Sequence, residues 1–144
     1  MATLGQFGDR MIRRGVRAEA NLNRRIRRIA VAILTEVVIQ TPVDTGRARS
    51  NWFVSVGGSP EEQPFDAYAP GQDGSTAAAN ATAAIAAGTA AVSDREPEQD
   101  IYISNNLPYI ERLNQGWSAQ APAGFIEAAV QYGIQVGNGV KVID

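Results

Sequence analysis

The first forty residues carry a helical repeat that is too long and too regular to suit any other element. Apolar or small residues recur there at steps of three or four, close to the 3.6 residues of an α-helical turn. Pro42 ends the repeat, because its ring disfavours helical geometry at Thr41. We therefore expect one continuous helix from Leu4 to Gln40, with Gly15 marking a bend or a frayed start. The stripe comprises Leu4, Phe7, Met11, Gly15, Ala18, Leu22, Ile26, Ile29, Ile33 and Val37.

Such a helix is about 55 Å long at the rise of an α-helix. A compact body of 144 residues does not need an element of that length. We expect a single domain over residues 1–144, from which part of the helix projects and packs on a neighbour. Neither an export signal nor a membrane span is indicated, so the chain is expected to stay in the cytoplasm until it is assembled.

Charge is distributed unevenly although the net charge is only −2. Eight of the 13 basic residues lie in the first 28 positions, and eight of the 15 acidic residues lie between positions 61 and 100. A helical wheel predicts that the arginines share the half of the helix opposite the apolar stripe. They are Arg10, Arg13, Arg14, Arg17, Arg24, Arg25, Arg27 and Arg28.

A face of this kind fits nucleic acid, an acidic neighbouring protein, or the acidic part of an identical subunit. A solvated helix side is the plainer alternative. We favour a protein partner, because the chain has no recognisable motif for reading nucleic acid and its pI is near 5.2. Arg24, Arg25 and Arg28 are the candidate contact residues.

The middle of the chain predicts a small sheet and an alanine-rich helix. Residues 52–56 form an aromatic and β-branched strand that ends at two glycines, and residues 101–104 are its expected partner. A turn is expected at residues 44–46 and an exposed loop at residues 58–74. Residues 75–92 predict a thin helix on the sheet, with Ser75 as its cap; a disordered linker is the alternative.

The last third predicts a short helix or turn at residues 108–113, a loop at residues 116–122 and a final helix. Pro122 suits the first turn of that helix, and residues 137–139 end it before a tail at residues 138–144. Its expected apolar face comprises Phe125, Ile126, Ala129, Val130 and Ile134. The expected fold is therefore α+β: a long N-terminal helix, a small antiparallel sheet, a middle helix and a C-terminal helix.

Composition removes many catalytic mechanisms. The chain has no cysteine and no histidine, which excludes thiolate nucleophiles, imidazole bases and the usual zinc ligands. Asp94, Glu96, Glu98 and Asp100 alternate as metal ligands on a strand would, but Pro97 interrupts them. We expect a solvated approach to the strand there, and no catalytic residue, metal or cofactor. The glycosylation pattern at Asn80 has no secretory context.

Four aromatic residues divide by position. Trp52 and Tyr102 lie in the expected strands, so a core role is predicted for both. Tyr109 and Trp117 lie in a turn and a loop, where an aromatic side chain is either an anchor at a subunit contact or a core residue.

Three blocks give the chain a resemblance to a known family: TPVDTGRARSNW at residues 41–52, IYISNNLPY at residues 101–109 and GWSAQAPAGF at residues 116–125. In this order and at this separation they resemble the tail-completion proteins of long-tailed bacteriophages, the lambda Z-protein type. The resemblance covers roughly residues 30 to 130. It departs at Asn114, where many relatives carry an acidic residue two places before the glycine that matches Gly116.

The resemblance implies a structural virion protein and not an enzyme. It implies a ring, with six-fold symmetry in relatives, that caps the tail tube and joins it to the neck of the head in the virion. DNA would pass through this ring without sequence-specific binding, and no membrane would be involved. Tyr109, Trp117 and Gln120 in the resembling blocks are expected at subunit contacts. The alternatives are an adaptor of the head-side connector, a DNA-binding protein that uses the basic helix, and a metal-dependent nuclease.

Overall fold

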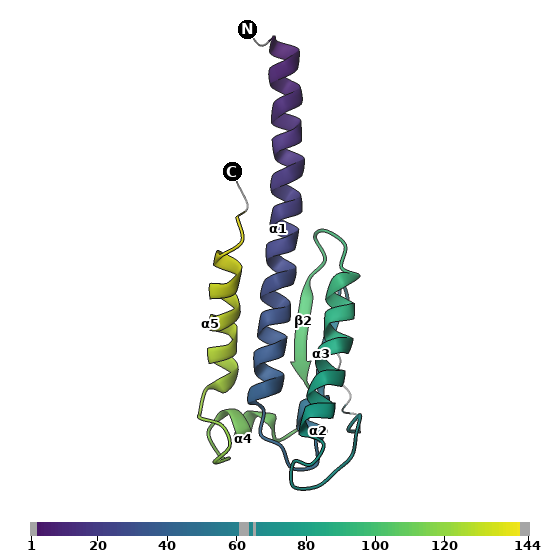
Figure 1. Cartoon of the computed structure of the whole chain (residues 1–144), viewed down its shortest axis with the longest axis vertical. Coiled ribbons are helices and arrows are strands. Elements are labelled where there is room, and N and C mark those ends of the chain that lie inside the picture. The colour runs from purple at the N-terminus through teal and green to yellow at the C-terminus, as the bar shows by residue number, and fades with distance from the viewer. Residues whose placement is uncertain (1–2, 61–63, 65, 142–144) are drawn as a thin grey trace.

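One long helix forms the axis of the molecule, and all other elements gather around its C-terminal half (Figure 1). The computed structural model describes residues 3–60, 64 and 66–141. Within them the helices are α1 (Leu4–Gln40), α2 (Arg47–Ser50), α3 (Ala77–Ser93), α4 (Ile110–Asn114) and α5 (Phe125–Asn138), and the strands are β1 (Trp52–Val56) and β2 (Ile101–Asn105). The predicted α+β class is confirmed.

The first helix has the bounds that the apolar stripe predicts. At its start the N–H of Gln6 donates to Oγ1 of Thr3 (3.2 Å), and the N–H of Thr3 donates to Oε1 of Gln6 (2.9 Å). This capping box satisfies N–H groups that have no partner within the helix. At its end Thr41 has extended backbone, as the following Pro42 requires. The helix continues through Gly15, so the predicted bend or frayed start there is wrong.

The two strands pair antiparallel at the predicted residues, with β2 one residue longer than expected. Val54 lies opposite Ile103, and Ser55 lies opposite Tyr102. Successive residues point to opposite faces of a sheet, so Trp52 and Val54 share the face on the core. The core prediction is therefore confirmed for Trp52. It is wrong for Tyr102, which lies on the other face and is only half-buried.

The alanine-rich segment is an ordered helix, α3, which packs on β1 and α1. Its buried positions are occupied mostly by small residues. At Gly88 an added Cβ would collide with Cδ2 of Leu34 and lie 2.9 Å from Cγ2 of Val54. Small side chains thus let the helix approach closely, and the linker alternative is wrong. The helix begins after Thr76, so Ser75 is not its cap.

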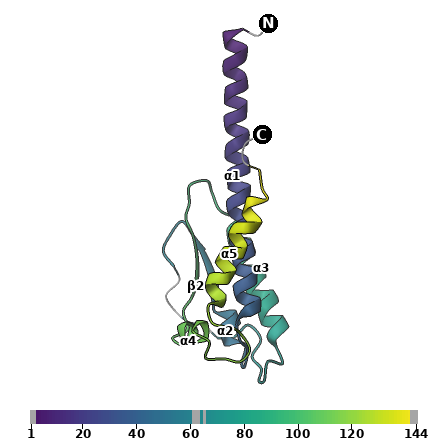
Figure 2. The ribbon, with the colours of Figure 1, turned by 90° about the vertical axis from the view of Figure 1, so that its left-hand side faces the viewer.

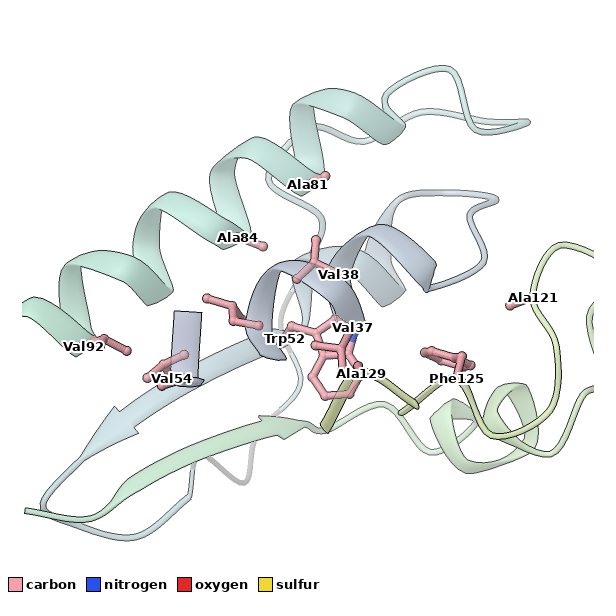
Figure 3. Packing of buried hydrophobic residues seen from close by; sticks show 12 residues of the cluster. Val37, Val38, Trp52, Val54, Ala81, Ala84, Val92, Ala121, Phe125 and Ala129 are labelled. Atoms are coloured by element: carbon pink, nitrogen blue, oxygen red, sulfur yellow. The ribbon is translucent and has the colours of Figure 1, made fainter. Parts of the chain in front are cut away.

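The core surrounds the C-terminal half of α1. Leu34, Val37 and Val38 are almost completely buried. α5 lies along one side of this half, and α3 with the sheet lies on another (Figures 1 and 2). Figure 3 shows Val37 and Val38 among side chains from the sheet, α3 and α5. The N-terminal half of α1 extends beyond the other elements (Figure 1).

The last helix packs by part of the expected face, since Phe125 and Ala129 are buried as predicted. α5 begins after Gly124, which has a φ of +78°, so Pro122 lies before the helix and not in its first turn. Its buried residues are Phe125, Ala129, Gly133 and Gly137. Each glycine gives room to an isoleucine of α1, because an added Cβ would collide with Ile33 at Gly133 and with Ile29 at Gly137. The predicted apolar face is wrong for Val130 and Ile134, which are exposed.

The loop expected at residues 58–74 is exposed over most of its described length. Residues 61–63 and 65 lie outside the described residues, as do residues 142–144 of the expected tail. Asn80 fastens the end of this loop: its Oδ1 accepts from the N–H of Ala69 (2.8 Å) and its Nδ2 donates to the Ala69 carbonyl (2.8 Å). Asn80 is fully buried, so it is not available as a glycosylation acceptor.

Candidate functional site

The three blocks that carry the family resemblance meet at one end of the molecule, next to the C-terminal end of α1 (Figure 1). Residues 41–46 leave α1, residues 105–114 lead through α4, and residues 116–124 lead into α5. They enclose a groove of about 290 Å³. Its lining residues are Pro42, Val43, Asp44, Thr45, Gly46, Ala48, Tyr109, Leu113, Ser118 and Gln120.

Gln120 fastens two of these blocks to each other. The N–H of Val43 donates to its Oε1 (2.8 Å), and its Nε2 donates to the Val43 carbonyl (3.1 Å). Both ends of the amide therefore have partners inside the chain. The side chain that was expected at a subunit contact positions the loop of Trp117 against the end of α1.

Trp117 lies on the surface of this loop. Its side chain is 72% exposed, which makes the core alternative wrong for this residue. The guanidinium of Arg112 lies 5.3 Å from the centre of its ring, within the range of a cation–π interaction. The backbone N–H of Trp117 also donates to the Arg112 carbonyl (3.3 Å). A large aromatic side chain is thus held in place while its outer face stays open to a partner.

Tyr109 lies at the rim of the same groove and is 40% exposed. Partial burial raises the pKa of its hydroxyl above the ordinary value; the positive charge of Arg47 lowers this pKa, and the negative charge of Asp44 raises it. The hydroxyl therefore stays protonated at neutral pH and is available as a hydrogen-bond donor. We call Tyr109, Arg112 and Trp117 together the aromatic surface.

Asn114 joins the end of α4 to the start of α5. Its Oδ1 accepts from the N–H of Ile126 (2.9 Å), and its carbonyl accepts from the N–H of Gly124 (2.7 Å). It therefore caps the start of α5 from a distant part of the chain. Its Nδ2 donates to both oxygens of Glu127 (2.9 Å each), which lowers the pKa of that carboxyl. An acidic residue at position 114 could still accept from Ile126 but would repel Glu127.

Two arginines of α1 have partners inside the chain. Nη2 of Arg25 donates to Oδ1 of Asn138 at the end of α5 (2.7 Å). Nη2 of Arg27 donates to the Arg95 carbonyl on another side of the helix (2.8 Å). Arg25 and Arg27 are about 160° apart around the helix, so they lie near the two edges of the predicted half. Of the three predicted contact residues, Arg24 and Arg28 are exposed, and Arg25 is used inside the chain.

The N-terminal part of α1 forms a second open surface. We call residues 4–22 the arm. Leu4, Phe7, Met11 and Leu22 of the predicted stripe are exposed there, with exposures between 45% and 88%. Ile12 and Val16, outside the stripe, are exposed as well. A row of large apolar side chains in water is unusual for an isolated chain and is typical of an interaction site.

The alternating acids at residues 94–100 are solvated, as expected. They lie in the loop between α3 and β2, which Arg95 anchors. Nε of Arg95 donates to the Gln99 carbonyl (2.8 Å), and its Nη1 donates to Oδ1 of Asn23 (3.0 Å). Sequence reasoning missed this buried arginine and the capping role of Asn114, because their partners lie in other segments, 72 and 12 positions away.

The part of the chain that the structure describes has no group of three or more acidic, histidine or cysteine side chains that could hold a metal ion. Over the same residues, no helix combines the length and the apolar character that a membrane span needs. The chain matches no protein-family model, and comparison with curated proteins and with solved structures gives no match either.

Proposed function

We propose that this protein is a structural, ring-forming component of the joint between the head and the tail of a bacteriophage. In this role it caps the tail tube in the manner of a tail-completion protein. The sequence blocks of residues 41–52, 101–109 and 116–125 support the proposal by their resemblance to that family. The observation that carries it is the aromatic surface, which lies beside the groove where these blocks meet and in which Trp117 is held in an exposed position.

Two open surfaces at opposite ends of the molecule suit a subunit of a joint. The aromatic surface lies next to the C-terminal end of α1, and the arm projects from the other end (Figure 1). Aromatic residues and arginine are enriched among the residues that dominate binding energy at protein interfaces. We assign the aromatic surface to the neighbouring ring, of the tail tube or of the neck, and the arm to contacts between copies of the chain. DNA passes through the ring without sequence-specific binding.

The proposal is tested by replacing Trp117 with Ala. Since the ring is largely exposed, circular dichroism and the unfolding midpoint are expected to stay nearly unchanged. In infected or complemented cells, tails are expected to fail to join heads or to grow to uncontrolled length. Tyr132→Ala is the matched control, because that aromatic side chain is exposed on α5 outside the resembling blocks. Normal virions with the Trp117 variant, or unfolding of its monomer, would contradict the proposal.

The size of the protein in solution and in purified particles is the second test. Multi-angle light scattering and electron microscopy are expected to show a closed ring, for which the family resemblance implies six subunits. Location of the protein in particles separates a tail-tube cap from an adaptor on the head-side connector. A permanent monomer that is absent from virions would contradict both.

A DNA-binding role is the second candidate, since Arg10, Arg13, Arg14, Arg24 and Arg28 are exposed along α1. If this role is correct, binding to duplex DNA weakens steeply with salt, with a slope of ~0.9 per phosphate contacted. We expect weak binding and a shallow slope.

We also expect no turnover of DNA, nucleotides or peptidoglycan with magnesium or manganese. Cleavage that Asp94→Ala abolishes would favour the nuclease alternative.

A further inference from the structure

The apolar stripe of α1 is covered over one part of its length and open over the rest. α5 packs on the stripe where Gly137 meets Ile29 and Gly133 meets Ile33. α5 ends at Asn138, which bonds Arg25. Beyond that point the stripe continues into the arm, where no helix or strand of the described residues covers it (Figure 1). The apolar stripe of the arm therefore continues a surface of α1 on which α5 already packs.

A groove in the body offers a matching apolar surface. It measures about 360 Å³ and lies between α1 and β2. Its apolar lining comes from Ile26, Ile29, Ala30 and Ile33 of α1 and from Ile101 and Ile103 of β2. All but Ala30 are only half-buried. Covering these side chains with another apolar surface would remove them from water, which is favourable.

One rim of this groove is acidic. Asp100 lines it together with Arg95, whose guanidinium bonds the Gln99 carbonyl and Asn23. The exposed Asp94, Glu96 and Glu98 belong to the same loop. The loop is held against α1, because Arg27 of α1 donates to the Arg95 carbonyl and Arg95 donates to Asn23. The acidic groups are therefore attached to a positioned loop before any partner arrives.

The arm has the complementary pattern. Phe7 and Met11 form an apolar ridge, and arginines lie beside it on the same side of the helix. Arg10 and Arg14 follow these two residues by three positions, which places them next to the ridge on a helix. An apolar ridge with a basic flank thus corresponds to an apolar groove with an acidic rim.

We propose that the arm of one copy of the chain binds in the groove of a second copy, with Phe7 and Met11 against the isoleucines and Arg10 and Arg14 beside the acidic loop. The proposal deepens the proposed function and rests on it, since it names the contact between neighbouring subunits of the ring. The arm cannot reach the groove of its own chain. Met11 and Ile26 belong to the same helix and are separated by about 22 Å along its axis.

The arm and the groove are different surfaces of the chain. Each copy therefore binds one neighbour through its arm and another through its groove, and the contact repeats from head to tail. Such contacts close into a ring when the rotation between subunits permits it. The arrangement also explains how a helix segment of this length persists. In proteins most of the stability of a helix comes from tertiary packing of its amphipathic face. The remainder of α1 nucleates the arm, and a neighbouring copy supplies the contacts.

Disulfide trapping tests the contact directly, because the natural chain contains no cysteine. The double variants Phe7→Cys/Ile26→Cys and Met11→Cys/Ile26→Cys can form a bond only between chains, since a disulfide needs Cα atoms within about 7 Å. Mild oxidation of the assembled protein is expected to give a ladder of covalent multimers with at least one pair. Val16→Cys/Ile26→Cys is the matched control, with its first cysteine on another side of the arm. Equal linkage in the control, or none in either test pair, overturns the proposal.

Charge reversal tests the same contact without a covalent bond. Arg14→Glu and Asp100→Arg are each expected to weaken self-association about tenfold, a change that corresponds to ~1.4 kcal/mol. Combining them is expected to restore most of it. Phe7→Asp is expected to abolish association, whereas Ile12→Asp, a change at another exposed position of the arm, leaves it intact. Analytical ultracentrifugation measures all five variants, and circular dichroism checks that the monomers are folded.

The outcomes separate this proposal from the proposed function. If rings form and none of the arm variants changes them, the arm contact is overturned and the ring stands. If the cysteine pairs link but only closed dimers form, the arm contact stands and the ring is overturned. If Arg14→Glu reduces binding to duplex DNA while self-association is unchanged, the arm binds nucleic acid and the proposal is overturned.

Discussion

The two halves of α1 carry the same apolar repeat, but its side chains are buried in one half and exposed in the other. In the C-terminal half, Leu34, Val37 and Val38 are almost fully buried. In the N-terminal half, Leu4, Phe7 and other apolar residues are exposed. Helical periodicity therefore shows that a helix has an apolar side, but it does not show what covers that side. One half meets partners within the chain, and we propose that the other meets them in a neighbouring copy.

Glycines that pack against the C-terminal half of α1 also differ from glycines in the arm. Gly88 and Gly133 lie where other helices approach the C-terminal half of α1, and an added Cβ at either position would collide with a side chain of α1. Gly8 and Gly15 lie in the arm, where an added Cβ meets nothing within 4 Å outside the helix itself. Close packing in the body depends on missing side chains, whereas glycine in the arm only weakens the helix.

The largest expected difference between the halves comes from removing one large side chain in each. Leu34→Ala leaves a cavity among buried groups, and we expect it to lower the free energy of unfolding by ~2–5 kcal/mol. Phe7→Ala is expected to change that of the monomer by less than about 0.5 kcal/mol, because the ring is exposed. Urea unfolding at low protein concentration, followed by circular dichroism, measures both. Similar losses for both variants would mean that the arm packs within its own chain.

Glycine-to-alanine substitutions sharpen the comparison, because their effects should have opposite signs. At Gly133 the new Cβ meets Ile33 and lies 3.1 Å from the Ile29 carbonyl, so we expect destabilisation by ~1–3 kcal/mol. At Gly15 the space is open and alanine is the better helix former, so we expect stabilisation of up to ~1 kcal/mol. Thermal unfolding of the two variants against the natural protein is the measurement. Destabilisation by Gly15→Ala would place a close neighbour at the arm.

A smaller effect on stability is expected at the start of α5, the helix that packs on the C-terminal half of α1. Asn114→Ala removes the side-chain cap of α5, and loss of such a cap costs ~1 kcal/mol. Asn114→Asp keeps an acceptor for the Ile126 N–H and should recover part of this loss. It should not recover all of it, since the carboxylate of Glu127 is within hydrogen-bond distance of this side chain. Equal stability of the alanine and natural proteins would show that α5 does not depend on this cap.

The smallest expected effect is a pH dependence at the same place. The hydrogen bond from Asn114 lowers the pKa of Glu127 in the folded state. Its contribution to stability is therefore complete above the pKa of an unfolded glutamate and is lost as the pH falls through the lower, folded value. Glu127→Gln should flatten this part of the stability profile in acid. Chemical unfolding in a pH series below neutrality, with Glu111→Gln as the exposed control on α4, checks it.

Local signals in the sequence account for the elements. Pro42 and the apolar stripe predict the bounds of α1, and β-branched residues between glycines predict β1. Gly46 has a φ of +86°, as the predicted turn allows. The signals were less informative about faces. For α5 they favoured the large residues Val130 and Ile134, whereas the structure buries Gly133 and Gly137. A helix that packs closely on another needs small residues at the contact more than it needs large apolar side chains.

The candidate site shows the same division. The sequence by itself determined an α+β chain with a long helix, a two-stranded sheet and aromatic residues in particular loops, because periodicity, proline and glycine act on nearby backbone. Only the tertiary structure decided that Trp117 is exposed, that Gln120 is used as a clamp, and that Arg25 and Arg27 serve different sides of α1. These outcomes depend on hydrogen bonds and packing between residues that are up to 113 positions apart. A pattern within one segment has no information on the surface that another segment presents to it.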